Sequence, residues 1–158
     1  MTKFLLSVHV LAAILAVGTI AVAASMFPRY AKQAVTDPAG GEGRSWGVAS
    51  FLHRVCRGYA VAGLVVPVFG LATGAQLGVL TDAWLITSMV LTALAAILLA
   101  VAILPRQQRL LSLDRQDNVT GALDAAASRL AMLTGMFNVL WAAVVVLMIV
   151  RPGSTTGA

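Results

Sequence analysis

Four long apolar segments, separated by stretches that hold almost all of the charged side chains, dominate the pattern of this chain. They cover approximately residues 4–27, 58–77, 83–104 and 130–150. The hydrocarbon core of a bilayer is about 30 Å thick, and about 20 apolar residues in a helix span it. Backbone groups cannot stay unpaired in lipid, so each segment is predicted to be a transmembrane helix. We therefore expect an all-α membrane protein, a four-helix bundle forming a single integral membrane domain over residues 1–158.

The composition narrows the class of function. Hydrophobic residues make up 59% of the chain and charged residues only 11%, which fits no soluble domain of this size. No Asp, Glu, Lys or Arg lies deep in the four segments, although transporters and proton pumps use such residues to bind or relay ions. No Ser-His-Asp set, zinc motif or phosphate-binding loop is present. The sequence therefore favours a protein that is not an enzyme, with no catalytic residues and no metal site.

The basic residues predict the orientation. Nine of the eleven Lys and Arg residues lie in two predicted loops, 28–57 and 105–129, on the same side of the membrane. The other side has only Lys3 and Arg151. Because basic residues concentrate in cytoplasmic loops, we expect both loops in the cytoplasm and both termini outside. The preference for Arg over Lys suggests a GC-rich bacterial genome, and hence a multi-pass protein of the bacterial inner membrane.

The net charge of +5 is interpreted as a topology signal and not as nucleic-acid binding, because acidic residues are dispersed among the basic ones. Membrane lipids are the expected partners, with contacts to anionic headgroups as a secondary role. A rival interpretation concerns the first segment, where Ala21-Val22-Ala23 resembles a signal-peptide cleavage site. The segment is long for a signal peptide and is followed directly by Arg29 and Lys32, so a retained helix is favoured.

Small residues mark one helix face. Gly70, Gly74 and Gly78 recur at a spacing of four, which places three missing side chains on one face and lets another helix approach closely. Two alternatives follow: packing against a helix of the same bundle, or docking of a partner subunit or a second copy. Pro67, just before these glycines, predicts a kink in the second helix.

Three aromatic residues, Tyr30, Trp46 and Trp84, are predicted to anchor the chain at the membrane interfaces. Ser45 or Ser50 is expected to cap a helix that begins near Trp46. Asp37–Gly43 is predicted to be a turn region. In the second loop, Leu110, Leu111 and Leu113 suggest a short interfacial helix, and Thr120 with Asp124 suggests the start of a helix that leads into the fourth segment.

The two histidines and the single cysteine are the remaining candidates for chemistry. His9 lies near the outer end of the first segment and His53 at the cytoplasmic entrance to the second. About 25 Å of helix separates residues 9 and 26 at 1.5 Å per residue, so the pair is not expected to share a cofactor. His9 either donates a hydrogen bond to a neighbouring helix or serves as one axial ligand of haem b. His53 is expected to be solvated. Cys56 is interpreted as an interfacial thiol, with palmitoylation or redox sensing as alternatives.

The first segment resembles the opening helix of a group of small bacterial membrane proteins. It begins at His9 and continues through small apolar residues to Gly18 and Thr19, and Phe27-Pro28-Arg29-Tyr30 follows. This is similar to the HemJ-type protoporphyrinogen oxidases and the CopD-like copper proteins. The resemblance implies a four-helix membrane fold and a haem- or copper-handling role for His9.

The third segment departs from that family. HemJ-type enzymes resemble one another most in a Trp-x-His-x-Lys stretch, whereas this chain has Trp84-Leu85-Ile86-Thr87-Ser88. Ile86 and Ser88 occupy the His and Lys positions. The resemblance therefore implies the fold more than the oxidase activity.

Together these observations favour a non-catalytic integral membrane protein, an accessory or structural subunit of a larger bacterial membrane complex such as a respiratory complex. The alternative is a haem- or copper-handling membrane protein of the HemJ/CopD-like kind that uses His9. A third hypothesis is transport of a small uncharged solute through a pore between identical chains.

Overall fold

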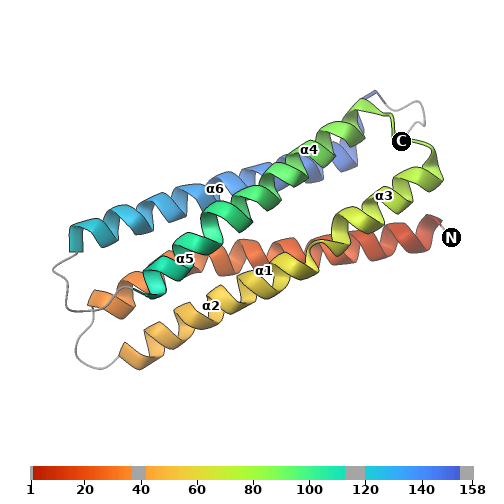
Figure 1. Ribbon diagram of the computed structural model, residues 1–158. Helices are drawn as coiled ribbons and strands as arrows, with labels where there is room; N and C mark the ends of the chain where they lie inside the picture. Colours follow the sequence, from red (N-terminus) through yellow and green to blue (C-terminus); the bar gives the residue numbers. More distant parts are fainter. Residues whose placement is uncertain (1, 37–41, 113–119, 154–158) are drawn as a thin grey trace.

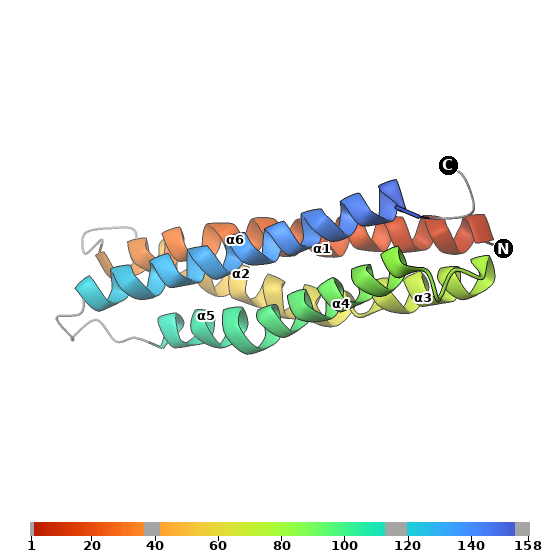
Figure 2. The same cartoon turned by 90° about the horizontal axis from the view of Figure 1, so that it is seen from above.

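The computed structural model describes residues 2–36, 42–112 and 120–153, and in these ranges the secondary structure is helical without strands. Four helical rods lie side by side, as predicted (Figure 1). The helices long and apolar enough to cross a membrane cover Lys3–Val35, Gly43–Leu77, Ala83–Leu111 and Gly121–Val150. The start of the first rod and the end of the last lie at the same end of the bundle (Figures 1 and 2).

The first helix, α1 (Thr2–Thr36), is longer than predicted. It continues through Pro28, so the prediction of a loop from residue 28 is wrong. Proline removes one backbone hydrogen bond from a helix. Here packing offsets that loss, because Phe27 at the end of the predicted segment and Ala31 and Ala34 beyond it are all buried.

The second rod also begins earlier than predicted. Helix α2 (Glu42–Ala62) replaces the second half of the predicted loop, because Ala49, Leu52 and Cys56 form one buried face. Ser45 and Ser50 lie inside this helix, so neither caps it. Most of the turn predicted at Asp37–Gly43 lies outside the described residues.

A break separates α2 from α3 (Val65–Leu77) at Gly63 and Leu64. Pro67 has no N–H to donate to the Gly63 carbonyl. That carbonyl accepts instead from the Val66 N–H at 3.1 Å, a tighter turn than the α-helical one. The kink predicted from Pro67 is therefore confirmed, although the break falls a few residues before the proline.

The third rod combines α4 (Ala83–Ile97), a π-helical turn η1 (Leu98–Ile103) and α5 (Leu104–Leu111). In η1 the hydrogen bonds span five residues and not four: the Leu104 N–H donates to the Leu99 carbonyl. Pro105 follows directly and could not continue the four-residue pattern, because it has no N–H. The extra residue in η1 rotates α5, and its buried face carries Gln107 and Leu110.

The fourth rod is α6 (Thr120–Val150). Its start at Thr120 agrees with the predicted helix start, and α5 holds Leu110 and Leu111, where a short helix was predicted. The segment 105–129 is therefore more helical than a loop between two membrane segments. Leu113 lies outside the described residues. Leu123, Ala127 and Leu130 are buried, and this apolar face holds the early turns of α6 against the bundle.

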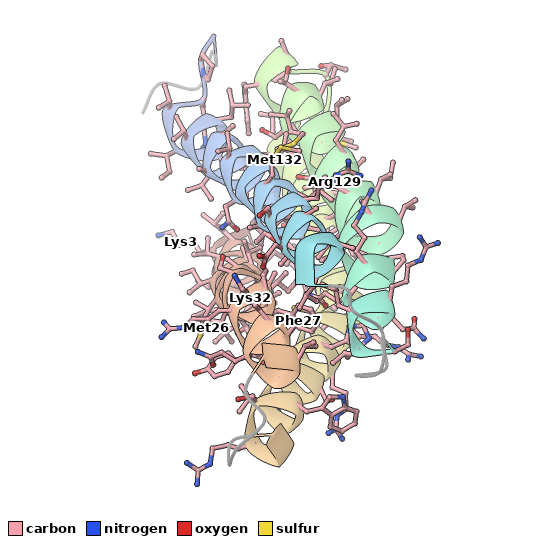
Figure 3. The ribbon with its side chains drawn as sticks, turned by 90° about the vertical axis from the view of Figure 1, so that its left-hand side faces the viewer. Lys3, Met26, Phe27, Lys32, Arg129 and Met132 are labelled. Carbon is pink, nitrogen blue, oxygen red and sulfur yellow. The ribbon has the colours of Figure 1, made fainter. Side chains whose placement is uncertain are left out.

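The rods are arranged around α1, which packs most extensively against α2 and also against α3 and α6. Helix α4 packs mainly against α6 and has little contact with α3 (Figure 1). The main core joins α1, α2, η1 and α6, with Phe27, Ile103, Leu130 and Phe137 at most 1% exposed. Figure 3 shows Phe27 pointing into this interior and Met132 pointing away from it. An exposed ion pair joins α1 to α6, with 2.8 Å between Lys32 Nζ and Asp124 Oδ1.

Candidate functional site

His9 lies on the face of α1 that meets α3. Its Nδ1 is 2.8 Å from the Val66 carbonyl oxygen, and the side chain is half-buried. A carbonyl oxygen only accepts, so Nδ1 donates and carries the proton. In a neutral imidazole this leaves the lone pair on Nε2. The hydrogen bond to a neighbouring helix, one of the two sequence alternatives, is thus present.

The three spaced glycines serve different purposes. A Cβ on Gly70 would lie 2.9 Å from His9 Cε1, and one on Gly74 would lie 2.9 Å from Leu85 Cδ2. Gly78 has φ +70° and ends α3 in the left-handed conformation that favours glycine. Gly70 and Gly74 therefore make room for α1 and α4 of the same chain, and Gly78 allows the turn that follows.

A second polar contact joins α2 to α5 at the other end of the bundle. His53 Nδ1 lies 3.0 Å from Gln107 Oε1, and Gln107 Nε2 lies 3.7 Å from Cys56 Sγ. Gln107 and Cys56 are both completely buried. Cys56 therefore lies inside the bundle and His53 is half-buried with one ring nitrogen bonded, because the π-helical turn brings a polar α5 residue against them. The two histidines contact different helices and do not share a site.

A third polar group lies between α1 and α6. Asn138 Nδ2 donates to Ser25 Oγ at 3.4 Å. Asn138 Oδ1 and Trp141 Nε1 are buried and have no hydrogen-bond partner among the described residues. Polar atoms without a hydrogen bond raise the free energy of a protein in lipid, so these two buried atoms are unfavourable for stability.

The three predicted interface aromatics differ in their surroundings. Tyr30 is half-buried against the core. Trp46 is 53% exposed and borders an apolar cavity of about 40 Å³ between α1, α2 and α5. Trp84 lies at the start of α4 but is buried: its Nε1 donates to Asp82 Oδ2 at 3.1 Å, and the Arg151 guanidinium carbon lies 5.6 Å from the ring centroid.

One exposed face of α6 was not recognised from the sequence. It consists of residues at alternating spacings of four and three, all exposed: Gly121, Ala125, Ser128, Met132, Gly135, Val139, Ala142 and Val146. We call this set the α6 seam. The spacing of these residues is visible in the sequence and is typical of a helix-packing face. Their exposure depends on the orientation of α6 in the bundle.

The residues brought together are suited to helix packing more than to chemistry. Among the described residues no three His, Cys, Asp or Glu side chains are grouped as a metal site would require. A scan against protein-family models finds no match for this chain, and searches of curated proteins and of solved structures find none either. The candidate functions must therefore be argued from the geometry.

Proposed function

We propose that this chain is a non-catalytic integral membrane protein that packs into a larger bacterial membrane complex, such as a respiratory complex, as an accessory or structural subunit. The α6 seam is the observation that carries the proposal. Five of its eight residues are Gly, Ala or Ser, and a Cβ on Gly135 would have no neighbour within 4 Å. Small residues at this spacing let the backbone of another transmembrane helix approach closely.

The rest of the bundle supports a scaffold-like role. Gly70 and Gly74, the other candidate docking glycines, are already used within the chain. The hydrogen bond of His9 and the buried contacts of Gln107 hold helices in place and leave no described cluster that resembles a catalytic set. We place the arginine-rich end of the bundle in the cytoplasm and both termini outside, following the distribution of basic residues.

Purification of the tagged full-length protein from its native membranes in a mild detergent tests the proposal. A second, different membrane protein should co-purify in fixed ratio. Gly135→Leu should reduce that recovery at least tenfold. Gly18→Leu is the matched control, because Gly18 is also an exposed helical glycine with no neighbour within 4 Å. Recovery of this chain alone, or only as copies of itself, would overturn the subunit proposal.

A second candidate function is supported by the tautomer of His9. Metal-ligating histidines usually donate their other ring N–H to a carbonyl or carboxylate, and the contact of Nδ1 with Val66 O has this form. His9 would offer Nε2 as a ligand to haem b, which would give the chain an electron-transfer or haem-handling role. A Soret band that is lost in His9→Ala and retained in His53→Ala would support this function. Its absence from protein purified without harsh detergent would count against it.

A further inference from the structure

The surface of α2 carries a shallow, open depression, which we call the α2 groove. It is lined by residues of this helix alone: Phe51, Arg54, Val55, Gly58, Tyr59 and Ala62. Gly58 leaves open space at its centre, because a Cβ there would have no neighbour within 4 Å. The walls are partly aromatic, with Phe51 60% and Tyr59 38% exposed. The groove is therefore apolar along most of its length, with one cationic residue in it.

The groove crosses the boundary between headgroups and hydrocarbon. With Gly78 at the opposite membrane surface, Arg54 lies 24 residues away, roughly 36 Å at 1.5 Å per residue, and Ala62 roughly 24 Å away. The hydrocarbon core is about 30 Å thick. Arg54 is thus at the depth of the lipid phosphates, whereas Ala62 is at the depth of the acyl chains.

The positive charge of Arg54, at the end of the groove nearest the lipid headgroups, has no acidic partner in the described part of the chain. Arg54 and the adjacent Arg57 are exposed, and neither has an ion pair in the described part of the chain. A guanidinium binds phosphate oxygens with two parallel N–H donors, and such charge-assisted bonds are about twice as strong as neutral ones. A partner helix laid on this face would have to supply an acidic side chain for Arg54, because burying an unpaired charge is unfavourable, whereas an anionic lipid carries its own phosphate.

We propose that this groove binds one anionic phospholipid of the leaflet at the basic end of the bundle. Arg54 binds the headgroup phosphate, with Arg57 adding positive charge beside it. One acyl chain lies across Gly58, beside the Tyr59 ring, and reaches Ala62. This inference rests on membrane insertion and goes beyond the proposed packing into a complex, since the groove lies on α2 and the seam on α6.

Native mass spectrometry of the full-length protein in detergent, with added dioleoyl phosphatidylglycerol or dioleoyl phosphatidylcholine, tests the lipid site. The wild type should retain one phosphatidylglycerol with at least tenfold preference over phosphatidylcholine. Arg54→Gln should lower the affinity for phosphatidylglycerol about tenfold, and Arg54→Lys should lower it less. Gly58→Leu, which fills the centre of the groove, should also reduce binding about tenfold while leaving Arg54 in place.

Arg129→Gln is the matched control, because Arg129 is an exposed arginine on α6, away from the groove (Figure 3). It should retain wild-type binding. Equal losses in Arg54→Gln and Arg129→Gln would overturn the site in favour of general charge attraction, and an inert Gly58→Leu would overturn the acyl-chain contact. The co-purification of a partner protein is measured separately, so the failure of one proposal is distinguishable from failure of the other.

Discussion

The imidazole of His9 occupies the space that a side chain at Gly70 would need. The two residues come from α1 and α3, and only 2.9 Å would separate His9 Cε1 from a Cβ at residue 70. The same ring donates to the Val66 carbonyl at 2.8 Å. The polar side chain of His9 thus bonds to a backbone carbonyl that Gly70 leaves accessible. This contact joins the first two rods.

Replacing Gly70 with Ala should therefore destabilise the protein by about 1 kcal/mol. The added Cβ would overpack the contact with His9, which costs about 1–3 kcal/mol. The higher helix propensity of Ala offsets up to about 1 kcal/mol of this. Gly18→Ala should instead stabilise by about 0.5–1 kcal/mol, since the space beside Gly18 is open. Thermal unfolding in one detergent measures both changes. A cycle with His9→Ala should show coupling, with Gly70→Ala no longer destabilising once the ring is gone; strictly additive effects would contradict the contact.

Gln107→Leu should destabilise the contact between α2 and α5 by about 1–3 kcal/mol, the usual effect of leaving buried polar groups without partners. His53 Nδ1 and Cys56 Sγ would both lose the amide. The fully buried Cys56 should react with a maleimide only slowly in the wild type and at least several-fold faster in this variant. Gln108→Leu is the control, because Gln108 is exposed; rapid labelling of Cys56 in the folded wild type would contradict its burial.

Arg151 joins the end of α6 to the start of α4. It has φ +44°, its Nε donates to the Met148 carbonyl at 3.3 Å, and its guanidinium lies over Trp84. Arg151→Ala should cost about 1 kcal/mol through the lost cation–π contact. Arg151→Gly should be less destabilising than Arg151→Ala, because glycine adopts a positive φ without strain. Unfolding temperatures of the three proteins decide this, and a Gly variant less stable than the Ala variant would be the contrary result.

The orientation is tested with a membrane-impermeant maleimide on intact cells. In a Cys56→Ala background, Gly153→Cys should be labelled from outside, whereas Arg109→Cys should be labelled only after the cells are opened. The expectation follows from nine basic residues at one end against two at the other. The reversed pattern would contradict the proposed topology without affecting the bundle itself.

The sequence by itself determined the class and the number of membrane-spanning rods. Runs of about 20 apolar residues cannot be accommodated otherwise in a bilayer, so four spans follow from length and hydropathy alone. It did not determine where the helices end. Residues 28–36 contain charges and were predicted as loop, and the helix expected near Trp46 was placed outside the membrane segment, yet Ala31, Ala49 and Leu52 pack into a core that extends past the apolar segments.

The tertiary structure alone decided which faces are used. Gly70, Gly74 and Gly78 look equivalent in the sequence, but one admits His9, one admits Leu85 and one forms a turn. Gln107 faces Cys56 because of a π-helical turn just before Pro105. Helical periodicity specifies which residues share a face. Whether that face meets protein or lipid depends on how all four rods pack together, and no local pattern contains that information.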